Sequence, residues 1–199
     1  EPGIVTEEFA KELSQLKKVC PHFHLSLQSG CTDTLKRMNR RYTAQEYAEK
    51  CEILRKYFSC PALTTDVITG FPGETEEDFM DTMDIAEKID FLHMHIFPFS
   101  PREGTPAAVM KNQVPDTVKK ERLHILSALQ DKIRAELLAD FVKTHSSVDV
   151  LFETTVDGYA MGHAPNFMEV KVKCDCSLSG KIVKVKLTHS DESYLYGEI

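Results

Sequence analysis

The sequence predicts an α/β protein in which parallel β/α units are followed by a small antiparallel β-barrel. Three observations lead to this class. Strand patterns alternate with helix patterns as far as residue 99, one long helix pattern follows, and short alternating strands with tight turns fill the remainder. With 199 residues and 42% hydrophobic content, the chain has room for one large or two small domains. We expect domains over residues 1–142 and 143–199.

Helix caps and β-branched runs define the elements of the first part. Thr6 precedes two glutamates and opens a helix, Thr43 with Glu46 three positions later forms a capping box, and Thr75 precedes an acidic helix. The expected helices cover 6–18, 32–38, 44–58 and 76–89, and the expected strands cover 23–27, 63–69 and 93–99. Three such units do not close a barrel, so this part forms an open sheet with its ligand site at the carboxyl ends of its strands.

A long helix links the two expected domains. Pro115 opens it, and leucines and an isoleucine at helical spacing continue it to residue 144. Short strands are expected over 148–152, 168–172 and 182–187, with turns at Asp157-Gly158 and Ser179-Gly180. This pattern is typical of a small β-barrel or sandwich.

The net charge and the cysteines limit the classes of function that the chain can have. The net charge of −7 argues against electrostatically driven nucleic-acid binding, and residues 143–199 hold six lysines and eight acids, so RNA contact must be local. No long apolar run or basic leader is present, which favours a cytoplasmic protein that does not span a membrane. The six cysteines are read as reduced thiols. Cys174 and Cys176 could share a metal, but no second ligand pair accompanies them, so no metal site is expected.

Polar groups follow the expected strands. Gln28 and Ser29 come at the end of the first strand and should point into a pocket, although a plain strand-to-turn junction has the same pattern. The loop 70–73 (Gly-Phe-Pro-Gly) is either a phosphate-binding turn or an ordinary strand-to-helix turn. Two histidine pairs alternate along strands, at 22 and 24 and at 93 and 95. With no third ligand nearby in sequence, packing or hydrogen bonding is favoured over metal binding.

Four ordered motifs carry a family resemblance. They are Phe23-His24-Leu25-Ser26-Leu27-Gln28-Ser29-Gly30-Cys31, Met38-Asn39-Arg40-Arg41-Tyr42-Thr43, Thr65-Asp66-Val67-Ile68-Thr69-Gly70-Phe71-Pro72-Gly73-Glu74-Thr75 and Phe99-Ser100-Pro101-Arg102-Glu103-Gly104-Thr105-Pro106. Together they resemble the radical S-adenosylmethionine (SAM) methylthiotransferases. The first motif is most similar to the MtaB-like branch, which adds a methylthio group to C2 of N6-threonylcarbamoyladenosine at tRNA position 37. The final strands resemble that family's RNA-binding TRAM domain.

The resemblance implies roles for individual residues. SAM would lie at the carboxyl ends of the strands, bound by Gln28, Ser29, Arg40, Asp66, Ile68, Phe97 and Pro98. Gln28 offers an amide donor and acceptor, and Arg40 can form a forked contact with the methionyl carboxylate. The anticodon stem-loop of tRNA would contact Arg102, Tyr159, His163, Asn166, Phe167, Lys171 and Lys173. Aromatic rings on a loop between strands would stack on unpaired bases, while the lysines contact phosphate.

The chain departs from the family pattern in its cysteines. Family members hold two 4Fe-4S clusters, one of them on a Cys-x-x-x-Cys-x-x-Cys loop, and no such triplet occurs here. The chain thus resembles a C-terminal part, half of a TIM-like radical SAM barrel plus TRAM, with no catalytic residue and no activity alone. A half-barrel also exposes a strand edge, which favours self-association. Two alternatives stay open: a non-catalytic RNA-binding or scaffold module, and a methylthiotransferase acting on isopentenyladenosine tRNA or a ribosomal protein.

Overall fold

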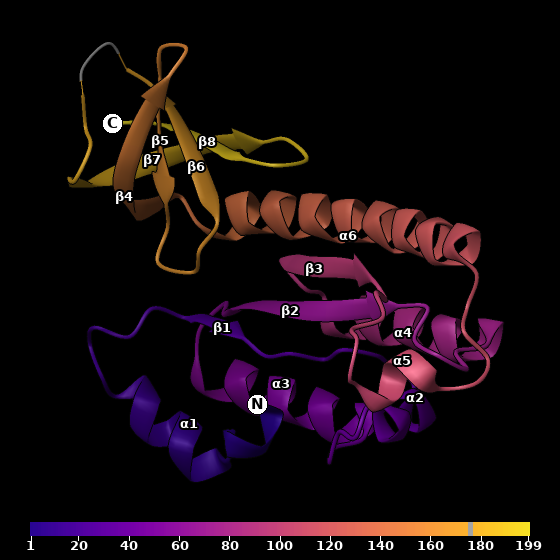
Figure 1. The fold of residues 1–199 in the computed structure, drawn as a ribbon. Coiled ribbons are helices and arrows are strands. Elements are labelled where there is room, and N and C mark those ends of the chain that lie inside the picture. Colours follow the sequence, from indigo (N-terminus) through magenta and orange to yellow (C-terminus); the bar gives the residue numbers. More distant parts are fainter. Residues whose placement is uncertain (175–176) are drawn as a thin grey trace.

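A computed structural model describes residues 1–174 and 177–199, and Figure 1 shows its two parts: an open sheet with helices, and a small barrel at the far end of a long helix. The elements of the first part are η1 (Pro2–Ile4), α1 (Glu7–Ser14), β1 (His22–His24), α2 (Thr32–Arg37), α3 (Ala44–Tyr57), β2 (Ala62–Thr69), α4 (Glu76–Ile89), β3 (His93–Pro98) and α5 (Pro106–Val109). Those of the second are α6 (Asp116–Thr144), β4 (Ser147–Val156), β5 (Tyr159–His163), β6 (Glu169–Lys173), β7 (Ile182–Ser190) and β8 (Leu195–Glu198).

The first part is a parallel sheet in the order β1-β2-β3, as the alternation of elements predicts. Its helices begin where the capping residues indicate. The hydroxyl of Thr6 accepts from Phe9 N, and Thr43 and Thr75 each form a capping box at the start of α3 and α4. β1 is shorter than expected, because after His24 the chain leaves the ladder and returns to it only at Gln28, which bridges Val67.

The two faces of this sheet differ. Alternate residues of β2, among them Leu63 and Val67, point into a core built with α3, α4 and α6. The other residues of β2, including Asp66 and Ile68, point to the opposite face, which in β3 carries the exposed side chain of His95. One face therefore stabilises the sheet, and the other presents polar and aromatic side chains. We call the second one the open face.

Helix α6 joins the two parts. Leu126, Leu129 and Ile133 on its first half belong to the core under the sheet, whereas Leu138 and Phe141 near its end belong to the core of the barrel. In Figure 1 the helix runs along β3 and then reaches the barrel. Both hydrophobic cores therefore depend on this one element.

The second part is a closed barrel with strand order β4-β5-β6-β8-β7. The expectation of a purely antiparallel barrel is wrong in one place, because β6 and β8 pair in parallel.

Two strands, β5 and β8, were not expected from the sequence. Both are short and contain a glycine, which weakens a strand pattern. At Gly162 in β5 a Cβ atom would lie 2.1 Å from the carbonyl oxygen of Leu151, so the barrel requires glycine there.

The barrel packs against the amino ends of the parallel strands. Ala62 and Leu92, which lie next to the start of β2 and β3, share the barrel's hydrophobic core. On the open face, the ring of Phe167 stacks on His22 with ring centroids 4.4 Å apart and on His163 at 4.6 Å. We call the His22–Phe167–His163 stack the seam. The carboxyl ends of the strands lie at the other end of the sheet and stay free of the barrel.

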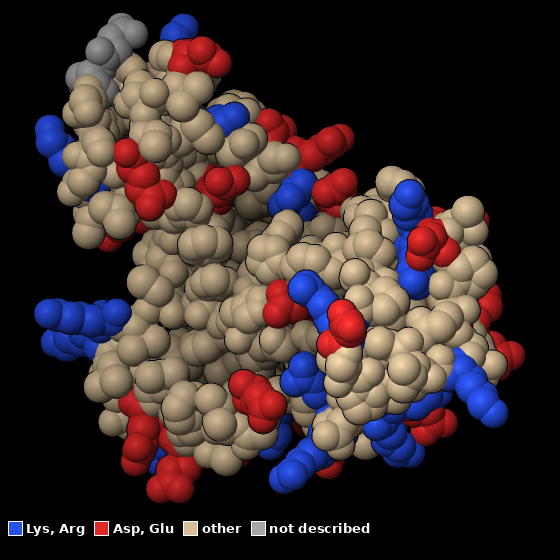
Figure 2. Space-filling view, viewed as in Figure 1, with Lys and Arg blue, Asp and Glu red and all other residues tan. Residues whose placement is uncertain are grey.

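Charged side chains do not gather into one patch on the face shown in Figure 2, where lysines, arginines and acids are interspersed around a hollow, mostly uncharged centre. This distribution agrees with the net charge of −7 and with the expectation that any RNA contact is local. Among the described residues, no helix combines the length and apolar character needed to cross a membrane.

Candidate ligand groove and barrel face

Two adjoining cavities of about 630 and 330 Å³ lie at the carboxyl ends of the parallel strands. Gln28, Ile68, Thr105 and Ala107 line both of them, so together they form one groove, which we call the edge groove. Its position agrees with the general location of ligand sites in parallel α/β sheets.

The edge groove brings together most of the residues predicted to bind SAM. The larger cavity is lined by Gln28, Asp66, Ile68, Phe97 and Pro98, and Arg40 lines the smaller one. Arg102, predicted to contact substrate or RNA, also lines the larger cavity. Because Arg37 and Asn39 also line the smaller cavity, the groove combines two amides, one carboxylate and three guanidinium groups with apolar surface. Such a lining can bind a molecule that has a planar ring, hydroxyl groups and a carboxylate.

Gln28 has an unusual backbone at the centre of this groove. Its φ is +68°, and its N–H donates to Asp66 O at 2.8 Å while its carbonyl accepts from Ile68 N at 2.9 Å. A left-handed conformation costs free energy in a non-glycine residue and persists only where the surrounding structure holds it. The two hydrogen bonds to β2 fix the residue, so its amide has a defined place at the groove wall.

Ser29 does not line the groove. It is buried, and its hydroxyl accepts from Cys31 N at 3.2 Å and lies 3.5 Å from the hydroxyl of Thr82 on α4. Gly30 next to it donates its N–H to the same Thr82 hydroxyl, and a Cβ at this glycine would lie 2.5 Å from Thr82 Cα. The Ser-Gly pair therefore joins the first strand to α4, and Ser29 has no contact with the cavities.

The loop 70–73 is a structural turn in this protein. Gly70 N donates to the buried carboxylate of Glu74, and Gly73 N donates to Asn112 O, so these amides are not available to a phosphate. Glu74 also accepts from Arg122 of α6 at 2.6 Å. Burial raises the pKa of Glu74, against the opposing effects of Gly70 N and Arg122. The buried pair ties α6 to the loop, a role that the glycines in the motif did not indicate.

Sequence reasoning missed the residues that close the smaller cavity. Pro106 and Ala107 belong to α5, Thr105 directly precedes this helix, and Met110 follows it. They stand at the end of the fourth motif, from which only Arg102 was singled out. Pro106 at the start of a helix is the signal that could have indicated a wall there.

The open face carries a cluster of histidines around Asp66. His24 Nε2 lies 3.1 Å from Asp66 Oδ2, which also accepts from the Ser26 hydroxyl at 3.1 Å. The rings of His24 and His95 are 5.9 Å apart, and those of His93 and His95 are 4.6 Å apart. His24, Asp66 and the two histidines of β3 are far apart in the sequence, and the pairing of the three strands brings them side by side.

Apart from Arg102, which lies in the edge groove, the predicted RNA-contacting residues fall into two groups. Tyr159, Lys171 and Lys173 lie on the outer surface of β5 and β6, where strand pairing sets Tyr159 opposite Lys173 and Lys171 beside Tyr196. Tyr159 meets Tyr196 edge to face with centroids 6.5 Å apart. Lys171 lies 3.4 Å above the ring of Tyr194. We call this aromatic and basic surface the barrel face.

The barrel face continues onto residues that the sequence analysis did not consider. Tyr196 stacks on His189 with centroids 4.6 Å apart, and its hydroxyl donates to Asp191 at 2.7 Å. That hydrogen bond, more than burial, raises the pKa of Tyr196 to about 12. The tyrosine therefore stays neutral and presents an intact ring. Because β8 was not expected, its Tyr196 could not be placed beside Tyr159.

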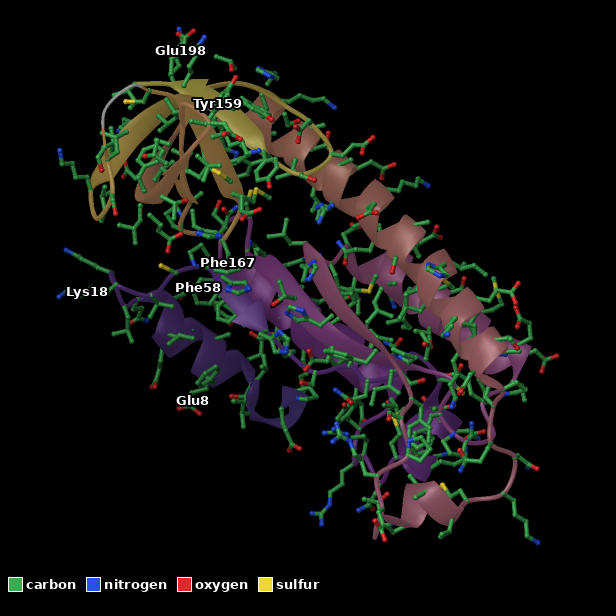
Figure 3. The ribbon with its side chains drawn as sticks, turned by 45° about the horizontal axis from the view of Figure 1, so that its top comes forward. Glu8, Lys18, Phe58, Tyr159, Phe167 and Glu198 are labelled. Atoms are coloured by element: carbon green, nitrogen blue, oxygen red, sulfur yellow. The ribbon has the colours of Figure 1, made fainter. Side chains whose placement is uncertain are left out.

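The second group lies at the seam, and Figure 3 shows Phe167 at the end of the barrel that faces the sheet, with Tyr159 farther out. The expectation that all these residues lie on a loop is wrong for Tyr159 and His163, which belong to β5. His163 Nδ1 lies 2.6 Å from Glu153. Asn166 is buried, with 4% of its surface exposed, and its side-chain oxygen accepts from Met168 N.

Cysteine ligands for an iron–sulfur cluster do not gather in the part of the chain that the structure describes. Cys31 and Cys51 are buried, Cys20 and Cys60 are exposed, and the one group of metal-ligating side chains found there contains no cysteine. Asp175 and Cys176, part of the Cys-Asp-Cys segment singled out in the sequence, lie outside the described residues. The described residues thus fit SAM in the edge groove but not a cluster.

Comparison with solved structures places the fold. The chain resembles coproporphyrinogen III oxidase (HemN) from Escherichia coli, described as a radical SAM enzyme, with a TM-score of 0.57 and 14% identity over 82% of this chain and 43% of that one. At this identity the likeness shows the fold alone. The first part of this chain therefore has a TIM-like radical SAM fold, of which it contains three parallel strands.

Sequence comparison is more specific. The model of the Radical SAM superfamily matches residues 2–86. Along its whole length the chain is 39% identical to a tRNA-2-methylthio-N(6)-dimethylallyladenosine synthase from Caldicellulosiruptor saccharolyticus, of which it covers 42%. It is 38% identical to the threonylcarbamoyladenosine tRNA methylthiotransferase MtaB from Bacillus subtilis, of which it covers 45%. The chain is thus similar along its whole length to tRNA methylthiotransferases, and it spans less than half the length of these relatives.

Proposed function

We propose that this chain is the part of a tRNA methylthiotransferase that binds SAM and tRNA, with SAM in the edge groove and RNA on the barrel face. The observation that carries the proposal is the convergence of Gln28, Asp66, Ile68 and Phe97 on one cavity at the carboxyl ends of the strands. Relatives of the chain are named as tRNA methylthiotransferases, which supports this class of reaction.

Each part of SAM has a chemical counterpart in the groove. The Asp66 carboxylate and the Gln28 amide can bind ribose hydroxyls, and the half-exposed ring of Phe97 with Ile68 offers an apolar surface to adenine. Arg40, at the other end, can form a forked contact with the methionyl carboxylate, because its weak 3.7 Å contact with exposed Glu1 is easily exchanged. Bound to a cluster, SAM supplies a radical. This chain positions the molecule.

Binding of SAM to the chain can be measured by isothermal titration calorimetry. We expect Ile68→Ala and Arg40→Met to weaken binding by about tenfold each, the size of one lost charge-assisted hydrogen bond or well-packed contact. Arg41→Met is the matched control, because Arg41 is exposed and does not line either cavity of the groove. Equal affinity of all three variants would contradict the assignment of the groove.

The RNA partner is the anticodon stem-loop, and the modified nucleoside is N6-threonylcarbamoyladenosine. Relatives named for dimethylallyladenosine and for threonylcarbamoyladenosine match the chain at 39% and 38% identity. Because these identities are nearly equal, the choice between the two nucleosides is tested directly. Stem-loops that carry one or the other nucleoside are titrated with the chain by fluorescence anisotropy. Preference for the dimethylallyl form would overturn the choice of nucleoside while leaving tRNA as the partner. A ribosomal protein substrate would be indicated by failure of both.

The barrel face, rather than the seam, recognises the stem-loop in this proposal. Tyr159→Ala removes a ring that can stack on a base, worth about 1–3 kcal/mol, so we expect roughly tenfold weaker binding. Lys171→Gln should reduce the salt dependence of binding by about one phosphate contact. Exposed Ile182→Ala is the control, because its β-barrel position lies outside the aromatic group. Loss of binding on Phe167 substitution alone would instead place recognition at the seam.

Two further parts of the proposal concern the chain by itself. It does not cleave SAM, because the described residues provide no cluster ligands, and an assay for 5′-deoxyadenosine under reducing conditions tests this directly. It self-associates weakly through β1, which is one of the two edge strands of the sheet. Sedimentation of a clean monomer at high concentration would refute the second statement. A cytoplasmic location completes the proposal.

A further inference from the structure

Three side chains on the open face are arranged like the ligands of a metal ion. They are His24 beside the end of β1, Asp66 on β2 and His95 on β3, and one potential ligand atom from each lies within 4.8 Å of the other two. In the part of the chain that the structure describes, this is the one such group of three. Three neighbouring parallel strands hold it, so its geometry rests on the most regular element of the fold.

The side chains around this group have the roles that outer-shell residues take in metal sites. Thr64 Oγ1 lies 3.1 Å from Nδ1 of His24, which leaves Nε2 directed at Asp66. The Ser26 hydroxyl donates to Asp66 Oδ2 and fixes the carboxylate. Hydrogen bonds to the second nitrogen of a ligating histidine and to a ligating carboxylate set their orientation and are a regular feature of metal centres.

The group is open to an incoming ion. The side chains of His24 and Asp66 are 39% and 30% exposed, and His95 is exposed as well. Among the described residues, no lysine or arginine pairs with the Asp66 carboxylate, which contacts the side chains of His24 and Ser26. An ion would therefore replace a single His24–Asp66 hydrogen bond, and water could fill the remaining coordination positions.

We propose that His24, Asp66 and His95 form a binding site for a divalent first-row transition metal ion. Two imidazoles and one carboxylate suit Zn²⁺ or Fe²⁺, whereas Mg²⁺ and Ca²⁺ prefer oxygen ligands alone. The site has three protein ligands and free positions, the arrangement of a metal that can also bind a small ligand. It differs from an iron–sulfur site, which requires thiolates. It shares Asp66 with the edge groove, whereas His24 and His95 line neither cavity of that groove.

Zn²⁺ and Co²⁺ are the probes. Equilibrium dialysis of the chain against Zn²⁺ should give one bound ion per chain that His24→Ala and His95→Ala each weaken by at least about tenfold. Thr64→Val, which keeps the shape of the side chain but removes its hydroxyl, should also weaken binding by about tenfold. His124→Ala is the matched control, because His124 is exposed on α6 and belongs to no such group. Circular dichroism checks that each variant is folded.

The absorption spectrum of Co²⁺ separates this site from binding by cysteine. Ligation by nitrogen and oxygen gives weak d–d bands alone, whereas thiolate ligation by exposed Cys20 or Cys60 adds an intense charge-transfer band. A charge-transfer band, or Zn²⁺ affinity unchanged in His95→Ala, would overturn the proposal. Because His95 does not line the edge groove, SAM titration of His95→Ala distinguishes failure of this site from failure of the proposed function.

Discussion

The barrel and the parallel sheet use their hydrophobic residues in different ways. In the barrel each strand has neighbours on both sides, and Val150, Phe152 and Val170 fill the interior. The sheet is covered by helices on one face only, and its open face carries His24, Asp66 and the other polar residues described above. The barrel closes on its own strands and completes its core with residues of α6, whereas the sheet leaves one whole face uncovered by helices.

The strongest test of this comparison is to open the barrel core. Phe152 is fully buried among barrel residues, and Phe152→Ala should lower the free energy of unfolding by about 4 kcal/mol. Leu151→Ala, at the neighbouring and partly exposed position, should cost much less. Urea denaturation monitored by circular dichroism measures both. Because α6 contributes to both cores, we expect one unfolding transition that moves as a whole. A separate shift of a barrel transition would show that the two parts unfold independently.

The second test removes the buried ion pair behind the sheet. Glu74→Gln removes the buried counter-charge of the Arg122 guanidinium and leaves it only the exposed carboxylate of Glu76, and we expect a loss of about 3 kcal/mol in unfolding free energy. The control is Asp140→Asn, which breaks an exposed pair with Lys143 and should change stability by less than about 0.5 kcal/mol. The same urea experiment applies. Equal effects of the two substitutions would mean that the buried pair does not hold α6 to the loop.

A smaller effect is expected where the two parts touch. Phe167 has a φ of +67° and stacks between two histidines. Phe167→Asn removes the ring and places at this position a residue that tolerates the left-handed region, so it isolates the stacking, worth about 1 kcal/mol. Hydrogen exchange of amides near His22 should accelerate, while exchange in the middle of the barrel stays unchanged. Unchanged exchange near His22 would show that the seam does not hold the barrel.

Acidification should weaken the same seam. Burial, followed by the charges of His24 and His163, lowers the pKa of His22, and burial with His95 lowers the pKa of His93. Both histidines bind protons more readily in the unfolded chain. Their stabilising effect is therefore complete above about pH 6.5 and is lost as the pH falls toward the lowered pKa values. The urea concentration at the midpoint of unfolding should decrease when the pH is lowered from about 7.5 to about 5.5. The decrease should be smaller in His22→Gln. An equal fall in both proteins would contradict this assignment.

The sequence predicted the fold best where local signals are strong. Thr6, Thr43 and Thr75 marked their helix starts because a cap is a contact within four residues. The short strands β5 and β8 were missed, since their glycines and outward tyrosines are explained only by closure of the barrel.

The candidate site was also predicted only where local sequence signals mark its residues. The residue types of the edge groove follow from motifs at strand ends, so most of them were found. Ser29 was placed wrongly beside Gln28, because the left-handed turn at Gln28 directs the next residue toward α4. The His24–Asp66–His95 group could not be seen in the sequence, because its three members meet only through strand register.

Helix α6 also fixes the angular relation between the two parts. Its 29 residues extend about 44 Å, and each residue turns the helix by about 100°. One residue inserted between Ile133 and Leu138 would swing the barrel around the axis by more than a quarter turn and lift Phe167 from His22. Seven inserted residues would nearly restore the phase but displace the barrel by about 10 Å. The distance and bearing from the edge groove to the barrel face are therefore encoded in the length of a single helix.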